Sequence, residues 1–332
     1  MALWKKRSLS VLLLLTLFLP ILSLTGCSAD TSPISQNGFY FDTIIQITVY
    51  SARDAACLDG CFTLAETYEN MLSATVEDSD VWRINHSKGQ PVTVSDDTIS
   101  LLTTALTYAE LSGGKIDPTI EPVSSLWNFH TEDEPSVPSD TAIKEALSHV
   151  DYTAVTISGN TVTLEDPEAA IDLGFIAKGY IADRIKDYLI SRQVKSALIN
   201  LGGNVLVLGS KPDGSAYHIG VQEPFAEDGS AITTVAIRDK SLVSSGVYER
   251  YFYEDGVLYH HILDTTTGYP LNNNIAGVTI LSDSSVVGDA LSTTCYCLGL
   301  EAGMKLIESL DQVEALFITM DNKLYYSSGF TQ

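Results

Sequence analysis

The sequence of 332 residues has few basic side chains. Only 19 Lys and Arg stand against 42 Asp and Glu, so the formal net charge is −23. A surface with this charge repels phosphate backbones and anionic lipid headgroups, which argues against nucleic-acid binding. A negatively charged ligand would therefore need a local device, such as a bound cation, a helix N-terminus or backbone amides.

Cysteine is also scarce, and no CxxC motif occurs. Outside the N-terminal segment the cysteines are Cys57, Cys61, Cys295 and Cys297, whose spacings argue against a zinc site. Cys57 and Cys61 are four residues apart on a predicted helix, where buried free thiols are expected, although an oxidising compartment would also permit a disulfide. Neither a GxGxxG nor a Walker motif is present, so the usual dinucleotide-binding loops are not expected.

The first 26 residues are predicted to be a lipoprotein signal peptide. A basic stretch at residues 5–7 precedes an apolar run that is too short for a comfortable membrane span. The run ends in LTGC at residues 24–27, which resembles a bacterial lipobox, so Cys27 would be lipidated, with palmitate among its acyl chains. The alternative is an ordinary secretory signal with an incidental cysteine. We therefore expect a protein of the cell membrane, lipid-anchored on its extracytoplasmic face.

The remaining sequence predicts a linker over residues 27–38 and one domain over residues 39–332. Residues 53–72 and 95–112 have apolar side chains at helical spacing. From about residue 150, short strands and turns predominate, interrupted by predicted helices over 175–192 and 284–300. Hairpins outnumber βαβ units, which indicates an α+β fold with mainly antiparallel sheets packed with helices.

Asp289 and Thr293 form a candidate metal site in the stretch GDALSTT. Residues four apart on a helix share one face, so a carboxylate and a hydroxyl can converge there on a hard cation such as Mg²⁺. An acidic residue near a helix N-terminus is more often only a partner of the helix dipole. The pair alone does not establish a metal site.

A second candidate is the corner IDLGFIAKGYIADRI, residues 171–185, where a predicted strand meets a helix. Gly174 and other small residues let a ligand approach the backbone, and the amides of a helix N-terminus favour anions. Lys178 could add a positive charge. The simpler interpretation is a tight turn with a surface lysine.

His261 lies at a predicted strand end in HHILDTTTGYP. A neutral imidazole at this place could take a proton from a hydroxyl nucleophile. Histidines in strands are more often structural, so this motif by itself is ambiguous.

Six blocks together resemble a known family. GGKIDPTIEPVSSLWNF, IDLGFIAKGYIADR, NLGGNV, VSSGVYERYF, HHILDTTTGYP and GDALSTTCYCLG occur in the order and spacing of the ApbE family of FAD:protein FMN transferases. The resemblance extends from about Phe39 to the C-terminus. It implies a T-fold-related architecture, FAD as substrate, Mg²⁺ as cofactor, and transfer of FMN to a threonine hydroxyl of an acceptor flavoprotein in a membrane redox system, with release of AMP.

The resemblance also implies a role for each matching residue. His261 would be the catalytic base, and Asp289 and Thr293 would bind Mg²⁺ together with the main-chain carbonyl of Ala177. The implied FAD contacts are Phe41 near the isoalloxazine, Lys115, Ile116 and Asp117 at the adenosine end, Gly174 and Tyr180 beside the diphosphate, and Leu263.

Two other functions stay open at the level of the sequence. In a metal-dependent FAD pyrophosphatase the same residues would activate water, and FMN and AMP would be released. A flavin-binding lipoprotein without catalysis would need neither base nor metal, and such proteins usually have two α/β lobes with parallel strands.

Overall fold

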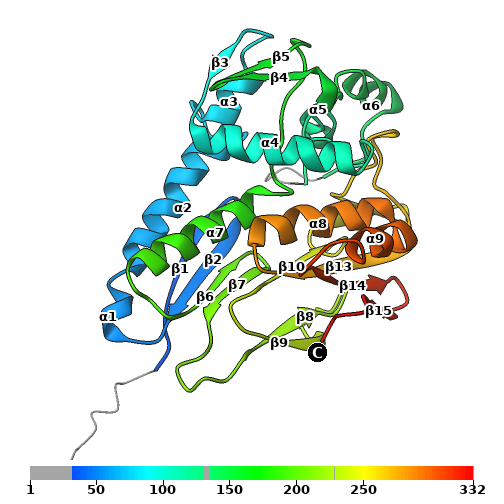
Figure 1. Ribbon diagram of the computed structural model, residues 1–332. Helices are drawn as coiled ribbons and strands as arrows, with labels where there is room; N and C mark the ends of the chain where they lie inside the picture. Colours follow the sequence, from blue (N-terminus) through cyan, green and yellow to red (C-terminus); the bar gives the residue numbers. More distant parts are fainter. Residues whose placement is uncertain (1–31, 130–134, 228, 332) are drawn as a thin grey trace, which may run out of the picture. The chain divides into compact units, whose positions relative to one another are not determined.

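The centre of the molecule is an eight-stranded sheet in which every neighbouring pair of strands is antiparallel (Figure 1). The computed structural model describes residues 32–129, 135–227 and 229–331. In spatial order the strands are β1 (Ile34–Tyr40), β2 (Thr43–Val49), β6 (Ser196–Leu201), β7 (Asn204–Gly209), β10 (Ser241–Gly246), β13 (Ile275–Ser282), β14 (Glu314–Thr319) and β15 (Leu324–Tyr326).

Helices cover one face of this sheet. α7 (Ala177–Ser191) packs on β6 and β7, and α8 (Ser285–Leu298) packs on β10 and β13. α2 (Leu58–Leu72) lies against α7, α4 (Asp96–Leu111) contacts α8, and α9 (Leu300–Ile307) contacts β14. All eight residues of β13 are buried, as expected for a central strand covered on both faces.

The opposite face of the sheet is covered by the hairpin of β8 (Tyr217–Gln222) and β9 (Ala231–Ile237), which shares a core with β7, β10 and β14 (Figure 1). A smaller sheet has the order β3 (Val92–Thr93), β5 (Thr161–Leu164) and β4 (Val155–Ser158). The short helices are α1 (Ala52–Ala55), α3 (Asp80–Asn85), α5 (Glu121–Ser124) and α6 (Asp140–Leu147), with 3₁₀ turns at Ser125–Trp127 and Tyr152–Ala154.

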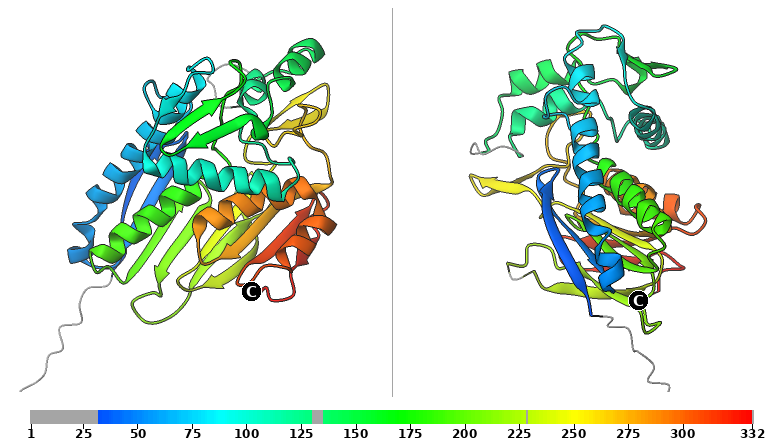
Figure 2. Two further views of the ribbon diagram at one scale, coloured as in Figure 1. Left: turned by 45° about the horizontal axis from the view of Figure 1, so that its top comes forward. Right: turned by 90° about the vertical axis from the view of Figure 1, so that its left-hand side faces the viewer.

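A separate hairpin is made by β11 (Tyr251–Glu254) and β12 (Val257–His260), drawn in yellow in Figure 2. Its strands pair only with each other in the described part of the chain. Phe252 and Tyr259 stack on each other at 5.3 Å between ring centroids, and both contact the fully buried Trp127. The Trp127 indole N–H donates to the carbonyl of Gly268 at 3.0 Å, so Trp127 anchors its loop to the segment after β12.

The α+β fold with antiparallel sheets is confirmed, and the four predicted helices are present as α2, α4, α7 and α8. One boundary is wrong, because β1 begins at Ile34, inside the predicted linker of residues 27–38. β1 is a mostly exposed edge strand, so it lacks the apolar alternation that reveals a strand.

The signal peptide and Cys27 lie outside the described residues. Among the helices that the structure describes, none is both long and apolar enough to cross a bilayer. Cys57, Cys61, Cys295 and Cys297 are all free thiols.

Candidate active site

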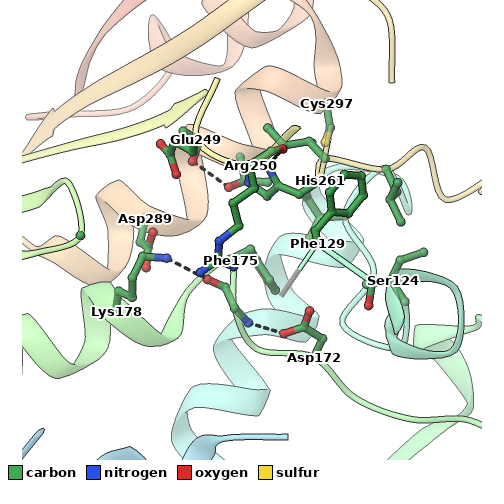
Figure 3. A pocket seen from close by; sticks show the side chains of 18 of the residues that line it. Ser124, Phe129, Asp172, Phe175, Lys178, Glu249, Arg250, His261, Asp289 and Cys297 are labelled. Carbon is green, nitrogen blue, oxygen red and sulfur yellow. Dashed lines mark hydrogen bonds between the residues drawn. The ribbon is translucent and has the colours of Figure 1, made fainter. Parts of the chain in front are cut away.

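A cavity of about 520 Å³ collects residues from distant parts of the chain (Figure 3). Its wall includes the loop after α4, the corner before α7, the end of β10, the segment between β10 and β11, the segment after β12, and one face of α8. The residues with predicted roles that line it are Lys115, Ile116, Asp117, Gly174, His261, Leu263, Asp289 and Thr293.

Asp289 and Thr293 face the cavity from consecutive turns of α8. The Asp289 side chain is almost fully buried, and its Oδ2 accepts a hydrogen bond of 2.8 Å from the backbone N–H of Gly179. Burial raises the pKa of Asp289, while the charge of Lys178 opposes the shift. Thr293 Oγ1 lies 3.0 Å from the hydroxyl of Ser245, which also lines the cavity.

This donor set fits a hard divalent cation. Mg²⁺ prefers oxygen ligands, and usually takes one or two from protein side chains and the rest from substrate phosphates and water. A buried carboxylate flanked by hydroxyls supplies such oxygens, and a cation would relieve the cost of burying the Asp289 charge. Ala177, the third predicted ligand, is buried in the first turn of α7 and is not among the residues that line the cavity.

Glycine lets α7 approach α8 closely at this point. A Cβ atom on Gly179 would lie 2.3 Å from the backbone oxygen of Ser285 and 2.7 Å from Cβ of Asp289. The absence of that atom brings the positive N-terminal end of α7 against the Asp289 carboxylate, where the helix dipole favours the negative charge. Beside it, Lys178 Nζ donates to the carbonyl of Gly174 at 3.2 Å, and both residues line the cavity.

His261 is positioned by the pairing of the β11–β12 hairpin. Its backbone N–H donates to the carbonyl oxygen of Arg250 at 3.2 Å, and its Nδ1 lies 3.3 Å from the same oxygen. We assign the proton to Nδ1, which makes Nε2 the basic nitrogen of the neutral ring. The neighbouring His260 is buried against Tyr296, and burial lowers its pKa to about 4. Only His261 of the two lines the cavity.

The cavity wall is rich in carboxylates. The basic side chains are Lys115, Lys178 and Arg250, and the acidic ones are Asp42, Asp117, Asp172, Glu249 and Asp289. An anionic ligand would therefore meet a net negative wall unless a cation is bound with it.

Glu249 and Arg250 are cavity residues to which the sequence analysis gave no role. The protein atoms around the Glu249 carboxyl raise its pKa to about 7; the charge of Asp289 adds to the shift, and those of Lys178 and Arg250 oppose it. Both residues lie in the block VSSGVYERYF, directly before strand β11.

Two of the predicted FAD contacts do not line the cavity. The Tyr180 hydroxyl donates to Asp97 on α4 at 2.5 Å, and its ring packs edge-on against Tyr68 of α2, so the side chain belongs to the helical layer. Phe41 has a positive φ of 53° in the β1–β2 turn, and its N–H donates to Glu69. The residue that follows it, Asp42, reaches the cavity instead.

Asp117 lines the cavity, but its carboxylate also organises the surrounding loops. Oδ1 accepts from the backbone N–H and the hydroxyl of Thr119 at 2.8 and 2.6 Å, and Oδ2 accepts from the N–H of Tyr152 at 3.0 Å. Its side chain is thus fixed at the end of the cavity where Lys115 and Ile116 also lie.

The cavity thus brings a histidine together with a carboxylate and a hydroxyl on an α+β frame, a combination that is typical of enzyme active sites. The model of the ApbE family matches residues 41–317, and the chain belongs to this family. It is 37% identical to an FAD:protein FMN transferase of Treponema pallidum over 92% of this chain and 89% of the relative.

Solved structures agree with this assignment. An ApbE protein from Thermotoga maritima superimposes with a TM-score of 0.83 at 30% identity, covering 90% of this chain and 97% of its own. The flavin transferase ApbE from Vibrio cholerae gives a TM-score of 0.81 at 30% identity, covering 90% and 98%. The protein is a transferase.

Proposed function

We propose that this protein is an Mg²⁺-dependent FAD:protein FMN transferase that moves FMN from FAD to a threonine hydroxyl of an acceptor protein and releases AMP. The observation that carries the proposal is the convergence of His261, Asp289 and Thr293 in one cavity, although His261 follows β12 and the other two lie on α8. The relatives with this name align over nearly the whole chain, which supports the same reaction here.

The reaction requires one bond to form and one to break. The threonine oxygen attacks the phosphorus of the FMN half, the bond from that phosphorus to the bridging oxygen breaks, and AMP leaves with that oxygen. His261 Nε2 accepts the threonine proton. Asp289 and Thr293, with the Ala177 carbonyl, would hold Mg²⁺, which supplies charge neutralisation on the phosphoryl oxygens.

The cavity also suggests how FAD is oriented. We place the adenosine end beside Lys115, Ile116 and Asp117, and the diphosphate near Gly174, where Lys178 adds positive charge. The isoalloxazine would then extend towards the β1–β2 turn that contains Phe41, with Leu263 as a further contact.

A direct test is to incubate the purified protein with FAD, MgCl₂ and candidate membrane flavoproteins, and to analyse the products by mass spectrometry. An acceptor threonine that gains the mass of FMN, together with released AMP, is the expected result. Free FMN and AMP beside an unmodified acceptor would instead indicate a pyrophosphatase. If FAD stays intact, both reactions are excluded and flavin binding without catalysis is the remaining function.

We also propose that Cys27 is lipidated and tethers the enzyme to the extracytoplasmic face of the cell membrane. Strand β1 begins at Ile34, only seven positions after Cys27. A short tether would raise the local concentration of the enzyme beside membrane-bound acceptors. Labelled palmitate should be incorporated into the full chain and not into a Cys27→Ser variant; equal labelling of both would exclude this anchor.

A further inference from the structure

A row of aromatic rings leads from the cavity to the protein surface. Tyr248 lines the cavity and is 9% exposed. Phe225 contacts Tyr248 edge-on at 6.1 Å and Tyr251 at 5.2 Å between ring centroids, and Tyr251 contacts Tyr253 at 5.8 Å. Tyr251 is 40% exposed and Tyr253 61%, so the row becomes steadily more accessible away from the cavity.

The outer end of this row is on β11, which also offers an unpaired strand edge. The His261 N–H bonds to Arg250, and the register continues with Phe252 opposite Tyr259. In an antiparallel ladder the backbone groups of alternate residues point to opposite sides, so those of Tyr251 and Tyr253 point away from β12. Within the described ranges neither residue has a backbone partner on that side.

We propose that an extended segment of the acceptor protein docks on β11, with its side chains on Tyr251 and Tyr253 and its backbone paired to the strand edge. This inference rests on the proposed transfer to a protein, since only such a reaction needs a macromolecule at the cavity mouth. Strand addition to an exposed edge is a common way to bind an extended peptide, and exposed tyrosines are frequent anchors of interfaces.

The position of β11 beside the cavity indicates that the acceptor protein is what binds to this strand edge. Arg250 directly precedes β11 and lines the cavity, and Tyr251 is paired with His260, the neighbour of the proposed base His261. A segment that lies along β11 and continues past Arg250 therefore enters the cavity where the hydroxyl must lose its proton. FAD would fill the cavity itself, and the tyrosines at its mouth would remain available for the second substrate.

The test compares the double variant Tyr251→Ala/Tyr253→Ala with Tyr325→Ala. Tyr325 is also 40% exposed and also lies on an edge strand, β15, but it does not line the cavity. The full chains are purified in detergent, and the probe is the purified acceptor that the wild-type enzyme labels most strongly with fluorescent flavin. Acceptor KM and kcat, the Kd of FAD and the thermal melting temperature are measured for each protein.

We expect the double variant to raise the acceptor KM about tenfold, with kcat, FAD affinity and melting temperature nearly unchanged. Tyr325→Ala should match the wild type. An unchanged acceptor KM in the double variant would overturn the docking site and leave the transferase function intact. If the wild type labels no protein at all, the transferase function and the docking site both fall.

Two further outcomes would also contradict docking. A loss of FAD affinity equal to the loss of transfer would mean that the tyrosines support the cavity. If the effect occurs only after reconstitution in phosphatidylcholine–phosphatidylglycerol vesicles, and not in detergent, the tyrosines contact the lipid surface.

Discussion

Replacing Gly179 with alanine should separate α7 from α8 and weaken the candidate metal site. The new Cβ would lie 2.3 Å from the Ser285 oxygen and 2.7 Å from the Ser285 carbonyl carbon, and these backbone atoms cannot rotate away. Overpacking a well-packed site costs about 1–3 kcal/mol, and we expect a value near 3 kcal/mol. Alanine gains about 1 kcal/mol in helix propensity over glycine, so the net loss should be about 2 kcal/mol.

This loss can be measured by thermal unfolding of the metal-free protein. A destabilisation of about 2 kcal/mol in a domain of this size corresponds to a melting temperature that is roughly 3 °C lower. The affinity for Mg²⁺ should fall by about 10-fold or more, because the Gly179 N–H that orients Asp289 is displaced. Isothermal titration with MgCl₂ in the presence of FAD would give this value.

Gly60→Ala is the matched control. Gly60 is also helical, in α2, and its new Cβ would lie 2.0 Å from the Tyr188 hydroxyl, which is the end of a side chain that can move. Its melting temperature should stay close to that of the wild type. If Gly179→Ala melts at or above the wild-type temperature and binds Mg²⁺ equally well, the close approach of α7 to α8 does not control the site.

Three further predictions concern ionisable groups of the cavity. Asp289→Asn should abolish Mg²⁺-dependent FAD cleavage and yet raise the melting temperature in EDTA at pH 7. The reason is that a buried carboxylate with a raised pKa destabilises the fold once it is charged. A melting temperature below that of the wild type would contradict this. His261→Ala should keep the Kd of FAD within about twofold and reduce kcat for transfer roughly 100-fold or more, whereas equal losses of binding and transfer would remove the base role. In EDTA, the stability of the wild type against urea should decline slightly as the pH rises from about 4.5 to about 7, because folding raises the pKa of Glu249 to about 7 and water at this exposed residue screens the effect; Glu249→Gln should lack this part of the decline.

The sequence predicts the fold class and the elements with strong apolar periodicity. α2 buries one side, and α8 buries most of its residues. The turn of the β11–β12 hairpin has Asp255 and Gly256, a typical residue pair for a two-residue hairpin turn. The weakly amphipathic or exposed elements were missed, above all β1, because its stability comes from hydrogen bonds to β2 and not from a buried face. Local composition carries no signal of such pairing.

The candidate site was predicted mainly through family blocks, which identify positions but not side-chain directions. Gly174, His261 and Asp289 do meet in one cavity. Tyr180 lies in such a block as well, but its hydroxyl bonds to Asp97, which is 83 residues away in the chain. A partner this distant decides the direction of the side chain and cannot be read from local spacing.

Because His260 and His261 are adjacent, their opposite orientations depend on the register of the β11–β12 pairing. A shift of the ladder by one residue would exchange the faces of His260 and His261. His261 would then occupy the buried position, where burial now lowers the pKa of the His260 imidazole to about 4, and His260 would face the cavity. The stacked rings of Phe252 and Tyr259 on Trp127 oppose that slip. Single-residue insertions or deletions should therefore be tolerated poorly between Tyr251 and His260, even though the turn that joins these strands is exposed.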